Sequence, residues 1–163
     1  MILCICGSIK IKDKDWIFNR IDEFASTLEK SENITIIEGN AKGVDFYAGE
    51  WAKEHNCELV LFPPDYEKYG KIACSVRNEE MVKLADFVLI LWNGSSYGTF
   101  EDICLCEKYN RPYKICYYGT QPAVNKYFVM AMEKLRDQFA TANKDFLNTV
   151  IEKAYEIWAR NTH

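Results

Sequence analysis

The most restrictive feature of the sequence is an apolar run that leads directly into a turn rich in glycine and serine. Phe87 to Trp92 are consecutive apolar residues, and the segment Asn93-Gly-Ser-Ser-Tyr-Gly-Thr99 follows them. A continuous apolar run of this length is typical of a strand that is covered on both faces of a parallel sheet. We therefore predict a buried central strand that passes through this turn into a helix.

The composition of the turn indicates an anion-binding site. Gly94 and Gly98 allow positive φ angles and close approach to a ligand, while Ser95, Ser96 and Thr99 supply hydroxyl groups where the helix begins. The first N–H groups of a helix have no partner within the helix, and the positive end of its dipole favours negative charge. The turn is therefore a predicted phosphate site.

Glu101 follows this turn and has two interpretations. A glutamate in the first turn of a helix stabilises the helix through its dipole, and this is a common role. Alternatively, the carboxylate lies beside the sugar of a phosphate-anchored nucleotide, where it stabilises an oxocarbenium-like transition state or activates water. This stretch alone leaves both interpretations open.

Strand-like and helix-like segments alternate along the first two thirds of the chain. The alternation predicts an α/β fold with a Rossmann-like, doubly wound parallel sheet of about five strands, right-handed crossovers and a ligand crevice at the carboxyl ends of the strands. The predicted strands are Ile2 to Cys6, Ile34 to Ile37, Leu59 to Phe62, Phe87 to Trp92 and Lys114 to Tyr118, and the predicted helices cover about residues 15–30, 46–55, 75–85 and 100–109.

Two other strand-to-helix turns have similar chemistry. Gly7-Ser8 follows the first strand, and Gly39-Asn-Ala-Lys-Gly-Val-Asp45 follows the second. Glycines 39 and 43, with Asn40 between them, favour a tight turn whose N–H groups point outward. An ordinary loop with Asp45 near the start of a helix is the alternative. On one parallel sheet, all three turns are expected at the same edge.

The segment from Asp65 to Cys74 is a long polar and aromatic loop, and loops of this kind often line a site. Tyr66 or Tyr69 could stack on a base or pack on the surface. Ser75 is the predicted N-cap of the next helix, which places Arg77 in its first turn. A cation there opposes the helix dipole, so Arg77 is a candidate phosphate clamp, with an ordinary surface arginine as the alternative.

Charge and hydropathy limit the partners that we expect. The net charge of −4 comes from intermixed acidic and basic residues without a Lys/Arg stripe, so we expect no nucleic-acid polymer as a partner. The apolar segment at the start, Met1 to Cys6, is too short for a signal sequence or a membrane span. We therefore expect a soluble, cytoplasmic protein that does not contact membranes and that binds a small molecule.

The cysteines and histidines offer little for metal chemistry. The seven cysteines include no Cys-x-x-Cys pair, and several lie in apolar segments, where cysteine behaves as a small hydrophobic residue. The chain has two histidines, His55 and His163. We expect reduced thiols, no metal centre and no other cofactor.

The alternation of strands and helices stops after Pro122. We expect residues 1–120 to form the nucleotide-binding domain, and residues 121–163 to form a helical extension with helices over about 124–139 and 144–160. The apolar stripe of the second helix is broad, so we expect it to pack on the domain or on a second subunit of a homodimer or higher homo-oligomer.

The ordered series of motifs resembles the SLOG superfamily of Rossmann-like nucleotide-binding proteins, in particular proteins similar to YspA and YpsA. The resemblance covers about residues 1 to 118. It is carried by Gly7-Ser8, Gly39-Asn-Ala-Lys-Gly-Val-Asp45, Pro64-Asp65-Tyr66, Tyr69-Gly70, Arg77-Asn78 with Met81, Ala85-Asp86 and Gly98-Thr99.

This resemblance implies an activity. The resembled group is related to lysine decarboxylase-like Rossmann nucleotide-binding proteins and to the cytokinin-activating phosphoribohydrolases, which cleave the N-glycosidic bond of nucleoside 5'-monophosphates. Their sites use an Arg with a later Met and a P-G-G-x-G-T-x-x-E-E stretch. Arg77 to Met81 and Gly98-Thr99-Phe100-Glu101 look similar, whereas Asn93-Gly94-Ser95 replaces Pro-Gly-Gly and Asn78 stands where Lys is common. Either Glu101 or Asp102 matches the carboxylate.

The resulting hypothesis is a nucleotide-binding hydrolase that acts on N-glycosidic bonds, with Glu101 and Arg77 as the catalytic candidates. The alternatives are a non-catalytic binder, sensor or sponge of a nucleotide-derived signal, and an oligomeric interaction module with a vestigial pocket. The predicted substrate-binding residues are Gly7, Ser8, Gly39, Asn40, Ala41, Gly43, Asp45, Asn78, Gly94, Ser95, Ser96, Gly98 and Thr99.

Overall fold

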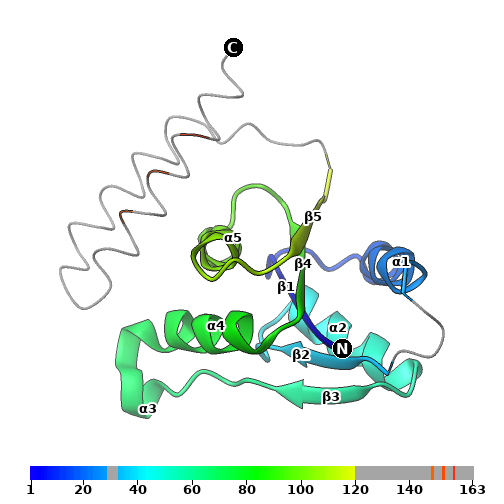
Figure 1. The fold of residues 1–163 in the computed structure, drawn as a ribbon, viewed down its shortest axis with the longest axis horizontal. Helices are drawn as coiled ribbons and strands as arrows, with labels where there is room; N and C mark the ends of the chain where they lie inside the picture. The colour runs from blue at the N-terminus through cyan, green and yellow to red at the C-terminus, as the bar shows by residue number, and fades with distance from the viewer. Residues whose placement is uncertain (29–32, 120–147, 149–151, 153–155, 157–163) are drawn as a thin grey trace.

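The computed structural model describes residues 1–28 and 33–119, together with positions 148, 152 and 156. Its centre is a five-stranded sheet in the order β3-β2-β1-β4-β5, in which every neighbouring pair of strands is parallel (Figure 1). The predicted α/β fold is therefore confirmed. The strands are β1 (Ile2–Gly7), β2 (Thr35–Glu38), β3 (Glu58–Leu61), β4 (Phe87–Trp92) and β5 (Tyr113–Tyr117).

Helices cover both faces of the sheet, as Figure 1 shows. One face packs against α1 and α2, and the opposite face packs against α4 and α5. The helices are α1 (Lys14–Ala25), α2 (Val44–Glu54), α3 (Tyr66–Tyr69), the 3₁₀ helix η1 (Gly70–Ile72), α4 (Ala73–Leu84) and α5 (Tyr97–Lys108).

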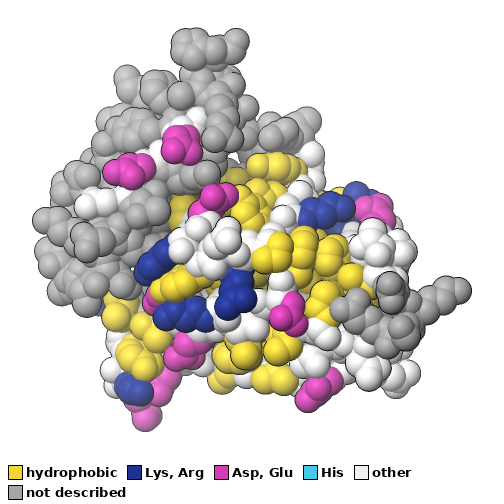
Figure 2. All heavy atoms as spheres, viewed as in Figure 1, with side chains coloured by type: hydrophobic (Ala, Val, Ile, Leu, Met, Phe, Trp, Pro, Cys, Tyr) yellow, Lys and Arg dark blue, Asp and Glu magenta, His cyan; other side chains and the backbone are white. Residues whose placement is uncertain are grey.

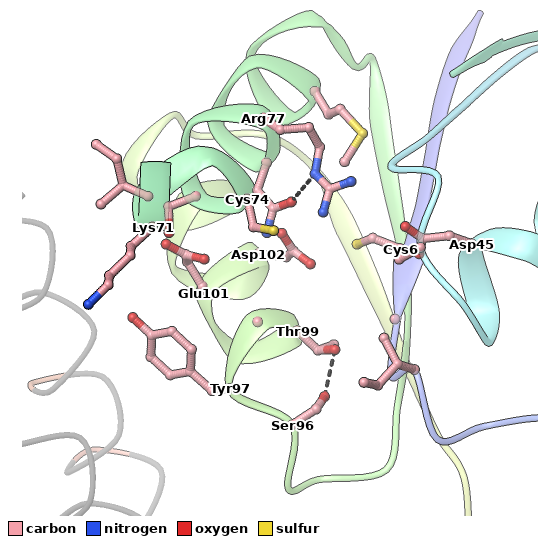
Figure 3. A pocket seen from close by; sticks show the side chains of 18 of the residues that line it. Cys6, Asp45, Lys71, Cys74, Arg77, Ser96, Tyr97, Thr99, Glu101 and Asp102 are labelled. Carbon is pink, nitrogen blue, oxygen red and sulfur yellow. Dashed lines mark hydrogen bonds between the residues drawn. The ribbon is translucent and has the colours of Figure 1, made fainter. Parts of the chain in front are cut away.

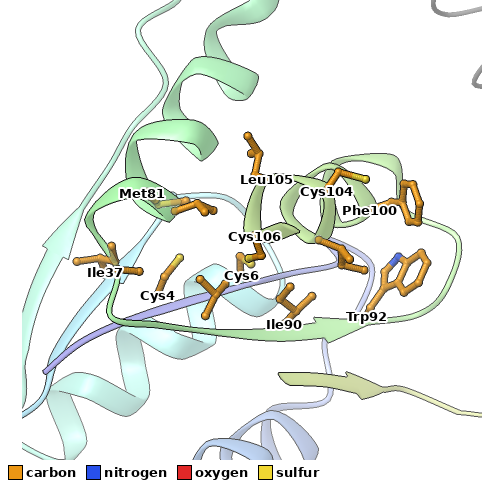
Figure 4. Close-up of a cluster of buried hydrophobic side chains, with 14 residues drawn as sticks. Cys4, Cys6, Ile37, Met81, Ile90, Trp92, Phe100, Cys104, Leu105 and Cys106 are labelled. Carbon is orange, nitrogen blue, oxygen red and sulfur yellow. The ribbon is translucent and has the colours of Figure 1, made fainter. Parts of the chain in front are cut away.

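The alternation of side chains along β1 and β4 divides the core into two layers. Leu3 and Ile5 of β1 lie in the layer formed with α1 and α2, whereas Cys4 and Cys6 lie in the layer formed with α4 and α5. Figure 4 shows the second layer, where Met81 of α4 lies among the strand residues. The cysteines at 4, 6, 104 and 106 are buried there with reduced thiols, so they serve as small core residues.

The strand order changes direction between β1 and β4. From β1 the chain adds β2 and then β3 on one side, and it returns through α4 to add β4 and β5 on the other side. The turns that leave the carboxyl ends of β1 and β4 therefore diverge toward opposite faces of the sheet. In a doubly wound fold, a ligand crevice is expected at this point.

Three predicted helix boundaries were wrong. Helix α5 begins at Tyr97 rather than at Phe100, so Glu101 is the fifth residue of the helix and does not lie in its first turn. Helix α1 ends at Ala25 rather than near residue 30, because the hydroxyl groups of Ser26 and Thr27 hydrogen-bond to the carbonyls of Glu23 and Phe24 at 2.8 and 2.7 Å. Ser75 is the third residue of α4 and not its N-cap, since the unpredicted α3 and η1 lead directly into that helix.

Other expectations concern parts of the chain that the structure does not describe. The two helices predicted after Pro122 lie outside the described residues, apart from three single positions. The domain boundary predicted near residue 120 and the apolar stripe proposed for homodimerisation involve the same part of the chain. Among the helices that are described, none combines the length and the apolar character that a membrane span requires. On the face drawn in Figure 2, Lys and Arg side chains lie among Asp, Glu and hydrophobic side chains.

Candidate functional site

A pocket of about 590 Å³ lies at the switch point between β1 and β4 (Figure 3). The turn after β1 contributes Gly7 and Ile9, and the region after β2 contributes Ala41 and Asp45. The segment from α3 to α4 and the first turns of α5 form the rest of the wall. The pocket therefore occupies the place where the fold class puts its ligands.

The predicted site residues divide into two groups. The three turns meet at the pocket through some of their residues, and Arg77 and Glu101 line the same space. The predicted residues that line the pocket are Gly7, Ala41, Asp45, Arg77, Asn78, Ser96, Gly98, Thr99 and Glu101. The predicted residues that lie outside its lining are Ser8, Gly39, Asn40, Gly43, Gly94 and Ser95. Asn40 and Gly43 instead line an adjoining pocket of about 320 Å³ with Lys12, Lys42, Phe46 and Tyr47, and Ala41 borders both pockets.

Ser8 joins two turns of the chain. Its N–H donates to the carbonyl of Leu91 at 3.0 Å, and its hydroxyl lies 3.0 Å from Asn93 Oδ1 and 2.8 Å from Ser96 Oγ. The side chain is completely buried. These contacts hold the turn after β1 against the turn after β4, which brings Ser96 and the start of α5 to the pocket.

Arg77 is held by protein oxygens. Its Nε donates to Asn78 Oδ1 at 2.7 Å, and its Nη1 donates to the carbonyl of Gly39 and to the carbonyl of Phe62 at 3.2 Å. The residue is only 9% exposed. Arg77 therefore ties α4 to the ends of β2 and β3, and it places one positive charge at the inner end of the pocket.

The carboxylate of Asp45 interacts electrostatically with Arg77. Its carboxylate accepts the N–H of Gly39 at 3.1 Å, and it also accepts hydrogen bonds from the backbone N–H groups of Ala41 and Gly7. Burial raises the pKa of Asp45 from 3.8 to about 6, while the Arg77 charge and these N–H groups act in the opposite direction. The carboxyl is therefore ionised at neutral pH and balances Arg77.

Glu101 has a different environment. The side chains of Ser75 and Asn78 hydrogen-bond to its carboxyl group, and the residue is 3% exposed. Burial raises the pKa of Glu101 from 4.5 to about 7, opposed by the Ser75 hydrogen bond and the Arg77 charge. Near neutral pH the group is present in both protonation states, as a general acid or base requires.

Asp102 is the second carboxyl group on this helix. Burial and the neighbouring Glu101 and Asp45 carboxylates raise the pKa of Asp102 well above its ordinary value, which favours the uncharged form of the group. It lines the pocket, and its Oδ1 is a buried atom without a hydrogen-bond partner among the described residues. Buried polar atoms are usually satisfied, so an oxygen without a partner next to the pocket is unusual.

The first turn of α5 presents unused donors to the same pocket. The backbone N–H groups of Tyr97, Gly98 and Thr99 have no acceptor in the part of the chain that the structure describes. Ser96 Oγ instead donates to Thr99 Oγ1 at 2.7 Å, drawn as a dashed line in Figure 3. Free amides at the positive end of a helix dipole favour an anion.

Several lining residues were not predicted as site residues. Cys6 was assigned to a buried strand, and Met81 was noted only as part of a motif. The loop from Asp65 to Cys74 was expected to line a site, but the prediction did not say which of its residues would do so. Those that line the pocket are Tyr66, Lys71, Ile72 and Cys74. Ser75 was predicted only as an N-cap, and Tyr97 was not singled out within its turn, because the contacts of both side chains depend on how α4 and α5 pack together. In the described residues, no group of three or more His, Cys, Asp or Glu side chains could hold a metal ion.

Comparisons with known proteins indicate a family resemblance and a shared fold. Residues 1–69 match YAcAr, the YspA, cpYpsA-related SLOG family. The predicted SLOG resemblance is confirmed by this match, which includes the turns after β1 and β2. A comparison with curated proteins gives no match.

Among solved structures, the fold is similar to that of DNA processing protein A from Helicobacter pylori. The TM-score is 0.57 at 19% sequence identity, and the match covers 94% of this chain and 81% of that chain. That protein is described by its single-stranded DNA binding mode. This finding contradicts our expectation that nucleic-acid polymers are excluded as partners. The expectation was based on the net charge and on the intermixed acidic and basic residues of the whole chain. These averages do not describe which charged groups gather at one edge of the sheet.

Proposed function

We propose that this chain binds a nucleotide in the pocket of about 590 Å³ and cleaves the N-glycosidic bond of a nucleoside 5'-monophosphate. The observation that carries the proposal is the arrangement of α5. Its free N–H groups at 97–99 and its buried carboxyl groups, Glu101 and Asp102, line one pocket and are about one helical turn apart. Phosphate and sugar would then be bound by successive turns of one helix.

The walls of the pocket suit the remaining part of a nucleotide. The side chains of Ile9, Ile72 and Met81 are apolar, and those of Tyr66 and Tyr97 are aromatic. Ligand pockets are usually lined by such side chains, with a few polar groups that orient the ligand. A base would lie against these walls, while Asp102 Oδ1 would meet a donor group of the ligand.

In the proposed reaction, protonated Glu101 acts as the general acid. The bond between the anomeric carbon and the base nitrogen breaks, its electron pair goes to the base, and the base takes the proton of Glu101. A water molecule then adds its oxygen to the anomeric carbon and gives a proton to the Glu101 carboxylate, which restores the starting state. Arg77 positions Asn78 and Asp45 and does not touch the reacting atoms.

The test is to incubate the purified protein with nucleoside mono-, di- and cyclic phosphates and to measure bound and free material by mass spectrometry. The wild type should release free base from a monophosphate. Glu101→Gln should lose at least 100-fold in rate, since general acid catalysis contributes about 10²–10⁴-fold, and should still bind the nucleotide. Undiminished release by Glu101→Gln would overturn the assignment, and Asp102→Asn identifies which carboxyl acts.

A second candidate is the capture of nucleotides or single-stranded DNA without turnover. The adjoining pocket of about 320 Å³ favours it, because Lys12 and Lys42 lie there beside Phe46 and Tyr47, and because it meets the larger pocket at Ala41. Lysines with aromatic side chains are typical of surfaces that bind single strands. The fold is also that of a protein described as binding single-stranded DNA. Stoichiometric recovery of an unaltered ligand would favour capture.

A further inference from the structure

We propose that Lys71, rather than Arg77, supplies the positive charge that contacts the phosphate of the bound ligand. This inference rests on the proposed function, because it assumes that a phosphate group occupies the pocket. It also assigns a role to Lys71, which is not part of the motifs that resemble the SLOG superfamily.

Arg77 is poorly placed for an incoming anion. Its Nε and Nη1 already donate to the protein oxygens of Asn78, Gly39 and Phe62, and its charge is balanced by Asp45. In Figure 3, its guanidinium group lies away from Ser96 and Thr99, with Asp102 between them in that view. A phosphate that approached Arg77 would also approach the ionised carboxylate of Asp45, and like charges repel.

Lys71 has the opposite properties. Among the described residues, Arg77 and Lys71 are the basic side chains that line the pocket, and Lys71 makes no hydrogen bond or ion pair with any of them. In Figure 3, its side chain extends past the carboxyl group of Glu101 to the side of the pocket on which the Tyr97 ring lies. An ammonium group at that side and the free N–H groups of residues 97–99 together would hold a phosphate.

The element that carries Lys71 can adjust without disturbing the core. Neither α3 nor η1 contains a buried residue, whereas Arg77 is held in a helix that packs on the sheet. A lysine side chain has four rotatable bonds and a compact charge, so it can follow a phosphate over several positions. Lys68 of α3 provides a matched control. Its Nζ lies 4.9 Å from the centre of the Tyr69 ring, and it does not line the pocket.

The test compares Lys71→Ala and Lys68→Ala with the wild type by calorimetry. The ligands are the four ribonucleoside 5'-monophosphates, the four matching nucleosides without phosphate, and a single-stranded oligothymidylate. We expect Lys71→Ala to bind the monophosphate that the wild type prefers about tenfold more weakly, with the loss shrinking at 1 M salt. Its affinity for the matching nucleoside should be unchanged, Lys68→Ala should bind as the wild type does, and Lys71→Arg should restore most of the affinity.

The outcomes separate this inference from the proposal on which it rests. If the wild type binds none of these ligands, the proposed function fails, and this inference fails with it. If the wild type binds a monophosphate and Lys71→Ala binds it equally well, the Lys71 inference alone is wrong. A loss confined to the oligothymidylate would assign Lys71 to the phosphates of a strand, and a loss for the monophosphate would assign it to the nucleotide. Equal losses for nucleoside and monophosphate would show a structural effect and would also overturn the inference.

Discussion

The two ends of the pocket are built in contrasting ways. At the inner end, the buried side chains of Arg77 and Asp45 line the pocket, and both hydrogen-bond to the backbone of Gly39, which lies behind them. At the outer end, the N–H groups at the start of α5 and the ammonium group of Lys71 have no partners among the described residues. The polar groups of Arg77 and Asp45 at the inner end already have partners in the protein, whereas the outer end has hydrogen-bond donors that a ligand could use.

This difference separates groups that stabilise the fold from groups that are available to a ligand. A buried polar group that has its partners contributes to stability, and the removal of one partner leaves the others uncompensated. Exposed donors without partners contribute little to folding. Asp102 is the exception, because it is buried near the inner end and yet its Oδ1 lacks a partner. We therefore expect substitutions at the inner end to act on stability, and substitutions at the outer end to act on binding.

The largest effect is expected for Arg77→Met. The substitution leaves the Asp45 carboxylate buried without its cation and leaves the carbonyls of Gly39 and Phe62 without a donor. Breaking a buried charge pair costs about 3–5 kcal/mol. The free energy of unfolding, measured in urea, should fall by that amount. Lys83→Met is the control, because its contact with Glu79 lies on the surface and should contribute less than about 1 kcal/mol. If Arg77→Met and Lys83→Met lowered the free energy of unfolding by the same amount, the inner end of the pocket would not have the special role in stability that we propose.

The next effect is a pH dependence that arises from Glu101. Its pKa is raised from 4.5 to about 7 in the folded chain, so the folded state binds the proton more tightly than the unfolded state does. The corresponding stability, roughly 3 kcal/mol, is present below pH 4.5 and is lost as the pH rises through 7. Unfolding curves between pH 5 and pH 8 should therefore show a shallower decline for Glu101→Gln than for the wild type.

Glu67→Gln is the control for this comparison, because Glu67 is an exposed carboxyl group on α3. Its pH dependence should match that of the wild type. A decline in Glu101→Gln as steep as in the wild type would mean that Glu101 is ionised in the folded chain, and it would weaken the case for Glu101 as a general acid.

The strands and the shared edge of the three turns could be predicted, because they follow from local patterns and from topology. Phe87 to Trp92 are apolar without interruption, and Val88 to Trp92 are all buried. Once the strands are parallel, the turns after β1, β2 and β4 must leave the same edge. The convergence of Gly7, Ala41 and Gly98 on one pocket needs no further information.

The partners of individual side chains could not be predicted in the same way. Arg77 was interpreted as a clamp exposed to the ligand because a helix was expected to begin at Ser75. The helix begins two residues earlier, and Arg77 instead reaches the ends of β2 and β3. The hydrogen bond from Ser75 to Glu101 joins α4 to α5, and such contacts between helices depend on packing that no local pattern reports.

The smallest effect, and the sharpest comparison of the two ends, is expected from a pair of glycine substitutions. A Cβ atom at Gly39 would overlap the Arg77 guanidinium group and lie 2.9 Å from Asp45 Oδ2, whereas a Cβ at Gly98 meets nothing within 4 Å. Gly39→Ala should therefore lower the free energy of unfolding by about 1–3 kcal/mol through overpacking. Gly98→Ala should leave it unchanged or raise it by up to about 1 kcal/mol, since alanine favours a helix.

Binding should show the reverse order, because the new methyl group of Gly98→Ala occupies the open space beside the free N–H groups of α5. Urea unfolding and nucleotide titration of both variants measure the two effects in the same samples. If Gly39→Ala is as stable as the wild type, the inner end is less tightly packed than its contacts indicate. If Gly98→Ala binds a nucleotide as well as the wild type does, the ligand does not approach the start of α5, and the phosphate site must lie elsewhere along the pocket.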